Sequence, residues 1–183
     1  MTLPQAQSQR SLPQRLLKLS ESLLPGASER GRPDPAKLRR SISTAYYALF
    51  SLLAEAGATA LAGTGPQNRE LRAILARTFE HSEMSNVCKG FANRNPSDRW
   101  KKCLGNQSVS LELACVAANF RDLQEARHEA DYDILKKPKK SDARKSVNQA
   151  MQAFTAWNTI KMAPEAKVFL LAIVFDKKAE RRA

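Results

Sequence analysis

The chain has 183 residues, of which 43% are hydrophobic and 26% are charged; these proportions are typical of a globular protein and exclude disorder over the whole chain. Thirty Lys and Arg residues outnumber eighteen Asp and Glu residues, so the formal net charge is +12 at pH 7. Such an excess favours polyanionic partners, namely nucleic acid, acidic proteins or anionic lipid, although it also serves solubility alone.

Helix is the expected secondary structure throughout, because helix-forming residues dominate and only seven glycines are present. Residues 1–11 are polar and predict a flexible N-terminal arm. Apolar residues at helical spacing predict helices over residues 12–24, 35–56, 67–79, 81–91, 108–135, 141–160 and 164–175.

The boundaries of these helices rest on individual residues. Asp34 is the expected N-cap of the second helix, and Gly57 is expected to end it before a loop of small residues at 58–65. Residues 93–107 are rich in turn-forming and basic residues, so they predict an irregular connection. Ser141 is the expected cap of the helix that follows the longest one.

No segment has the pattern of a strand, an internal repeat or a second domain. The sequence therefore predicts an all-α fold, an antiparallel bundle of about five to six helices joined by short connections. This single domain is expected over residues 12–176, with a charged tail at 177–183.

The longest predicted helix, which Ser108 or Ser110 would cap, has two contrasting faces. At about 100° per residue, a polar stripe lies opposite a stripe of small and apolar residues. The polar stripe consists of Arg121, Glu125, His128 and Tyr132, and the apolar stripe consists of Leu123, Ala126, Ala130 and Ile134. The apolar stripe is expected to pack on a neighbouring helix, so the polar stripe faces solvent, a partner or a polar cleft.

Arg121 and His128 have the chemistry of metal-independent RNA cleavage. An arginine stabilises a phosphate under attack by the neighbouring 2′-hydroxyl, and a histidine transfers the proton. One chain supplies a single histidine on this stripe, so an acid and a base together need two stripes across a homodimer. The alternative, which the spacing alone favours, is a solvated stripe of charge pairs such as Glu125 with His128.

Asp131 and Tyr132, near the end of this helix, are expected to have structural roles. Asp131 would pair with an arginine on a packed helix, either Arg39 or Arg40. Tyr132 would bury its ring while its hydroxyl finds an acceptor. The alternative is that Asp131 ligates or positions a bound group.

Adjacent tyrosines occur in the second predicted helix. Neighbouring residues on a helix point about 100° apart, so Tyr46 and Tyr47 cannot share a face. We expect Tyr47 in the core, as a structural residue, and Tyr46 at a boundary or interface. Stacking of a base on Tyr46 is the functional alternative, and packing in the core is favoured over it.

A run of lysines follows the polar stripe. It consists of Lys136, Lys137, Lys139 and Lys140, and Arg144 and Lys145 come soon after it. This run either holds a phosphate backbone next to the stripe or forms a solvated turn between two helices, and the sequence favours neither.

Cysteine spacing and hydropathy point to the cytoplasm. The three cysteines have no CxxC spacing and form no set typical of structural zinc, so free thiols and no metal site or cofactor are expected. The first residues lack the apolar core of a signal peptide, and the apolar run at 168–175 is shorter than the ~20 residues that span a membrane. We therefore predict a cytoplasmic protein that does not bind membranes.

Several segments, in their order, resemble a known family. The sequence RSISTAYYA at 40–48 resembles the second helix of HEPN domains, the "higher eukaryotes and prokaryotes nucleotide-binding" superfamily. The later RHEADYD at 127–133 resembles the Arg-x-x-Ala-Asp-Tyr signature of one bacterial branch. Residues 80–89 and the apolar close at 168–171 also resemble that branch, and the resemblance extends over nearly the whole chain from about Pro33.

This resemblance implies a bundle of about five helices that often dimerises. Catalytic HEPN proteins are ribonucleases with an Arg, a polar residue and a His several positions later. They often act as toxins in toxin–antitoxin or defence systems, some with a small nucleotidyltransferase as partner. Arg121, Asp122 and His128 match that pattern, with six residues between Arg and His, whereas the recurring Arg of the Ala-Asp-Tyr branch corresponds to Arg127.

Three functions follow as expectations. The favoured one is a non-catalytic HEPN-like protein that binds RNA or nucleotide, with Arg127 and the lysine run as nucleic-acid-binding residues. The second is an endoribonuclease toxin that uses Arg121 and His128 across a homodimer. The third is a helical scaffold for protein interaction, and a cognate antitoxin or nucleotidyltransferase is the protein partner implied by the resemblance.

Overall fold

The chain folds as a bundle of helices. The computed structural model describes residues 10–26, 33–133 and 135–180, so most of the predicted N-terminal arm lies outside the described residues. In chain order its elements are α1 (Leu12–Ser22), α2 (Pro35–Ala62), the 3-10 helix η1 (Pro66–Asn68), α3 (Arg69–Ala76), α4 (His81–Ala92), α5 (Asp98–Cys103), α6 (Leu111–Tyr132), α7 (Lys140–Ile160) and α8 (Pro164–Glu180). No strand occurs among these residues, which confirms the all-α class, although there are more helices than the five to six expected.

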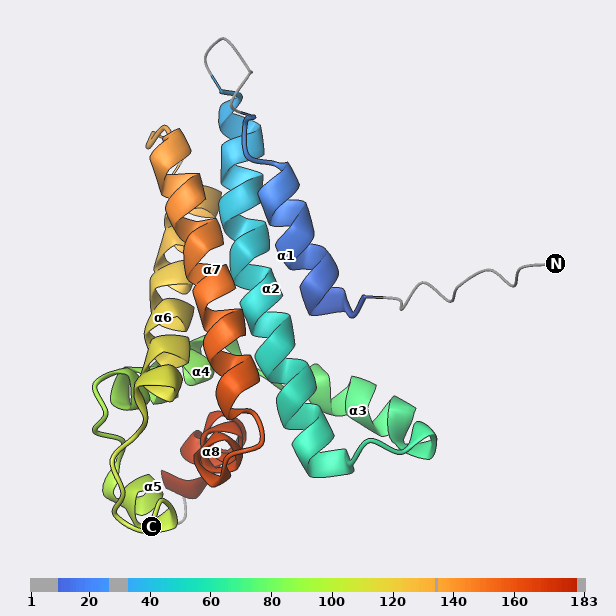
Figure 1. The fold of residues 1–183 in the computed structure, drawn as a ribbon, viewed down its shortest axis with the longest axis vertical. Coiled ribbons are helices and arrows are strands. Elements are labelled where there is room, and N and C mark those ends of the chain that lie inside the picture. The colour runs from blue at the N-terminus through green and yellow to red at the C-terminus, as the bar shows by residue number, and fades with distance from the viewer. Residues whose placement is uncertain (1–9, 27–32, 134, 181–183) are drawn as a thin grey trace, which may run out of the picture.

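The long helix α2 is the centre of the bundle. It lies beside α1, α6 and α7 along the long axis of the molecule, and it also contacts α3 and α8 (Figure 1). The helix α8 is seen nearly end-on below α7, and α3 projects from the lower end of α2 (Figure 1). The helix α4 packs on α6 and α8, so α6 is held between α2, α4 and α7. This arrangement places α6, with its polar stripe, against three neighbouring helices.

The helix α2 is long and apolar enough to cross a membrane by length and composition alone. Its central place in the bundle explains this composition, because most of its side chains are buried or half-buried against neighbouring helices. The buried side chains of α2 include Leu38, Leu49 and Leu53, which are at most 2% exposed.

The predicted end of α2 at Gly57 is wrong. Asp34 does cap the helix, because its carboxylate accepts a hydrogen bond of 2.8 Å from the backbone N–H of Ala36. The helix then continues through Gly57 to Ala62, and Gly63 ends it with a φ of +78°. Gly57 is instead a close-approach position, since a Cβ atom there would lie 2.5 Å from Cζ of the Phe79 ring. A buried packing partner therefore accounts for this glycine.

Two other segments differ from expectation. The helix predicted over residues 67–79 is divided into η1 and the short α3. The connection over residues 93–107 contains α5, because Trp100 is buried and its indole N–H donates a 2.6 Å hydrogen bond to Asp176 of α8. Trp100 thus anchors this segment to α8.

The helices α7 and α8 also depart from their predicted ends. The cap of α7 is Lys139 rather than Ser141, and the Asp142 carboxylate accepts a 3.0 Å hydrogen bond from the Lys139 backbone N–H. The helix α8 extends to Glu180, so the first part of the expected charged tail is helical.

Candidate nucleic-acid interface

The two faces of α6 lie as its periodicity predicts. Ser110 caps the helix by accepting a 3.1 Å hydrogen bond from the Leu113 backbone N–H. On the apolar stripe Leu123 and Ala130 are buried and Ala126 is half-buried; Ile134 lies outside the described residues. On the polar stripe Arg121 is half-buried, and Glu125, His128 and Tyr132 are exposed.

Arg121 and His128 line the same hollow on the surface between α6 and α4. The hollow has a volume of about 460 Å³, and its lining residues are Ser82, Ser85, Asn86, Arg121, Asp122, Gln124, Glu125, Arg127 and His128. His128 is seven positions after Arg121, which corresponds to a rise of about 10 Å along the helix axis. A phosphate-containing chain that lies along α6 therefore has room to reach both side chains at adjacent phosphates or sugars.

The α4 wall of this hollow was not foreseen from the sequence. Ser82, Ser85 and Asn86 are spaced by three and one residues, so they form a short polar stripe on one face of α4. That spacing is visible in the sequence, but short polar residues on a helix are too common to indicate a site unless the facing helix is known.

The other histidine, His81, is half-buried, and its ring packs against Tyr46 and Phe50 of α2. Its Nδ1 atom shares a hydrogen bond with the hydroxyl of Tyr46, and its backbone carbonyl accepts a 3.1 Å hydrogen bond from Gln124 of α6. Burial, together with the nearby positive charge of Arg127, lowers the pKa of His81. One chain thus presents one histidine to the hollow, as the sequence analysis anticipated, and His81 does not serve as a second acid–base group there.

Arg127 is at the centre of a polar cluster between α2 and α6. Its Nη2 atom donates a 2.9 Å hydrogen bond to the hydroxyl of Tyr47, and its Nε atom lies 2.8 Å from Oδ2 of Asp131. The second contact is an ion pair rather than an aligned hydrogen bond, since the Nε–H has no acceptor in hydrogen-bonding geometry. Burial acts to lower the pKa of Arg127, but Tyr47 and Asp131 outweigh it and the net effect raises that pKa.

The predicted partner of Asp131 is wrong. Asp131 pairs with Arg127 of its own helix and accepts a hydrogen bond from the hydroxyl of Ser43 on α2. Arg39 instead donates to the backbone carbonyl of Ala130 in the last turn of α6 and to those of Asp133 and Lys136 just beyond the helix. Arg40 is exposed and belongs to neither arrangement.

Tyr46 packs in the core, as was favoured over base stacking, whereas Tyr47 is not the core residue that was expected. Tyr46 is completely buried, and its ring centroid lies 5.6 Å from that of Phe120. Tyr47 is half-buried at the edge of the Arg127 cluster. Tyr132, which was expected to bury its ring, is 62% exposed. A buried Tyr46 cannot stack on a base, so Tyr132 is the tyrosine of this set that solvent or a ligand reaches most easily.

The lysine run forms a turn between α6 and α7 that hydrogen bonds hold in place. The Asp133 carboxylate accepts hydrogen bonds of 3.1 and 3.0 Å from the backbone N–H groups of Leu135 and Lys136. The Lys136 side chain pairs with Glu129, and this hydrogen bond raises the pKa of the lysine. Lys137 and Lys139 are exposed, and Lys140 Nζ lies 3.5 Å from the carbonyl of Gly26.

A second hollow lies between this turn, α6 and α7. Its volume is about 500 Å³, and three of the four lysines of the run, Lys136, Lys137 and Lys139, line it together with Arg39, Lys145 and the acidic residues Asp122, Glu125, Glu129 and Asp142. Asp122 and Glu125 line both hollows, so the two lie on either side of one short segment of α6. The structure therefore brings the predicted catalytic and nucleic-acid-binding residues onto neighbouring surfaces of α6 and of the turn that follows it.

Comparison with known proteins gives no relative. No protein-family model, curated protein or solved structure matches the chain. The HEPN resemblance therefore rests on the residue patterns described above. Among the residues that the structure describes, no group of three or more His, Cys, Asp or Glu side chains is placed to hold a metal ion.

Proposed function

We propose that this protein binds RNA through the α6 surface and the basic end of the bundle, without cleaving it as a single chain. The observation that carries the proposal is the shared hollow of Arg121, Arg127 and His128, which lies beside the lysine turn at the end of the same helix. Arginine and lysine side chains neutralise phosphates, and the release of counterions makes such binding favourable.

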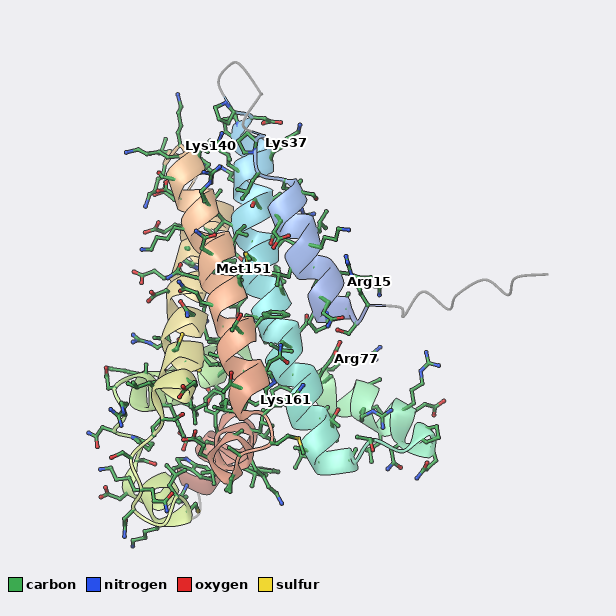
Figure 2. The ribbon with its side chains drawn as sticks, in the orientation of Figure 1. Arg15, Lys37, Arg77, Lys140, Met151 and Lys161 are labelled. Atoms are coloured by element: carbon green, nitrogen blue, oxygen red, sulfur yellow. The ribbon has the colours of Figure 1, made fainter. Side chains whose placement is uncertain are left out.

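Basic side chains lie at both ends of the bundle, so the two ends can be compared by substitution. Lys140 and Lys37 lie at the same end of the bundle, whereas Arg77 and Lys161 lie towards the opposite end (Figure 2). Glu125 lines both hollows, so it opposes the approach of phosphate and limits the path of a bound strand. A non-catalytic function fits the single histidine in the hollow, because cleavage through a 2′-hydroxyl needs both a base and an acid.

Salt dependence tests the proposal. Binding of single-stranded RNA is expected to weaken with salt, with a log–log slope of about −0.7 for each phosphate neutralised. The double variant Lys137→Gln/Lys140→Gln should flatten that slope by about one unit or more. The matched control, Arg77→Gln/Lys161→Gln, removes the same charge from the other end of the bundle and should leave the slope nearly unchanged. Equal slopes for both double variants would refute the location.

Glu125→Gln provides a test of opposite sign. Removing this carboxylate from the boundary between the two hollows should tighten RNA binding, because a repulsion is removed and no contact is lost. Weaker binding by this variant would show that the strand does not pass over this part of α6.

A ribonuclease is the second candidate, supported by the presence of Arg121 and His128 in one hollow. In a homodimer whose hollows face each other, one His128 would act as base and the other as acid, while Arg121 stabilises the charge on the phosphate. Cleavage of RNA without added metal, abolished in His128→Ala while binding remains, would establish this function. Binding without cleavage at any protein concentration would establish the non-catalytic one.

The setting of this function follows from the resemblance. The HEPN pattern favours a toxin–antitoxin or defence system in the cytoplasm, with a cognate antitoxin or nucleotidyltransferase as protein partner and a homodimer as the assembly. Co-purification of the chain with the product of a neighbouring gene, and its mass in solution, are the measurements that test these points.

A further inference from the structure

Tyr132 is a large aromatic residue that the fold leaves in solvent. It is the last residue of α6 and is 62% exposed, whereas Tyr46 is completely buried. It lies between the two features that carry the proposed function: His128 of the hollow is four residues earlier, and the lysine turn begins four residues later. Tyr132 also shares the polar stripe of Arg121 and His128 on α6, so a strand that follows this stripe from the hollow towards the turn passes Tyr132.

The ring of Tyr132 is held in place by contacts with two neighbouring side chains of α6. Its centroid lies 5.5 Å from the guanidinium carbon of Arg127, within the range of a cation–π contact, and 5.0 Å from the ring centroid of His128. Arg127 is itself fixed by Tyr47 and Asp131. The aromatic ring is thus positioned before any ligand binds, and a stacked partner would lose little additional conformational freedom.

We propose that Tyr132 stacks on an unpaired base, and hence that the RNA bound at this surface is single-stranded; this inference rests on the proposed RNA-binding function. A base in a duplex already has both of its faces covered by neighbouring base pairs, whereas a base in a single strand offers a free face to an aromatic ring. Phosphates on either side of the stacked base reach the arginines of the hollow and the lysines of the turn. The exposed aromatic ring supplies contact area that the charged residues around it do not.

The test compares substitutions at Tyr132 with a matched neighbour. The probe is a fluorescently labelled single-stranded oligoadenylate of about ten nucleotides, with a hairpin duplex of similar charge as the second probe. Tyr132→Ala should weaken binding of the single strand about 5- to 150-fold, the range that loss of one stacked base gives, and leave the duplex nearly unchanged. Tyr132→Phe keeps the ring and should bind within about 2-fold of wild type. Leu135→Ala removes a neighbouring apolar side chain that is 92% exposed and should have no effect.

The salt dependence separates stacking from charge. The slope for Tyr132→Ala should equal that of wild type, because a stacked base neutralises no phosphate. Binding of the single strand by Tyr132→Ala at wild-type strength overturns the stacking role and leaves the RNA-binding function intact. An equal loss for the single strand and the duplex also overturns it. No binding of either probe by wild type at about 50 mM salt overturns both the stacking role and the proposed function.

Discussion

The ion pair between Arg127 and Asp131 should be important for stability, and substitution of Asp131 tests this directly. The side chains of Arg127 and Asp131 are 18% and 30% exposed, so the pair lies between the surface and the interior. The Asp131→Ala substitution removes the ion pair and also removes the acceptor for the hydroxyl of Ser43, which is 2% exposed. His128 is exposed on the same helix and serves as the comparison.

The expected cost follows from these contacts. A hydrogen bond to a charged acceptor contributes about 1.5–3 kcal/mol, and a partly exposed ion pair adds about 1 kcal/mol or less. Asp131→Ala should therefore lower the free energy of unfolding by about 2–4 kcal/mol, whereas His128→Ala should change it by about 0.5 kcal/mol at most. For a chain of this length the difference corresponds to about 5–15 °C in Tm.

Urea unfolding followed by circular dichroism measures these free energies, and a double-mutant cycle isolates the hydrogen bond. Ser43→Ala and Asp131→Ala share one interaction, so the cost of the double variant should be smaller than the sum of the two single costs by about 1 kcal/mol or more. Equal unfolding midpoints for Asp131→Ala and His128→Ala would refute the structural role of Asp131. Additive costs in the cycle would refute its contact with Ser43.

Three further predictions concern single positions. Gly57→Ala should destabilise the fold by about 1–2 kcal/mol in urea unfolding, because the clash with the Phe79 ring outweighs the roughly 1 kcal/mol that alanine gains over glycine in a helix. A gain in stability would show that the Phe79 ring moves aside freely. The lowered pKa of His81 means that unfolding takes up a proton as pH falls. The contribution of His81 to stability is therefore complete above the ordinary histidine pKa near 6.5 and declines below it, and His81→Gln should weaken this decline. Burial raises the pKa of the Cys88 thiol, so iodoacetamide at about pH 8 should leave it unmodified in the native chain and modify it in urea; fast native labelling would contradict its placement.

Local patterns in the sequence sufficed for most of the helices and for the orientation of α6. The periodicity of apolar residues depends only on the helix repeat, so it separated the buried Leu123 and Ala130 from the exposed Glu125 and His128. The cap at Asp34 was predictable and Ser110 was one of two candidates for the cap of α6, because each cap involves a backbone N–H group two or three residues away. The function inferred from Arg121, His128 and the HEPN pattern stays a prediction.

The tertiary structure decided which polar groups meet. Asp131 could not be assigned to Arg127 rather than Arg39 from the sequence, since that choice depends on how α2 and α6 are rotated and shifted against each other. The same packing buried Tyr46 and left Tyr47 beside Arg127. Spacing along one helix fixes the angle between side chains, but only the neighbouring helices determine which of those directions leads into the core and which leads to solvent.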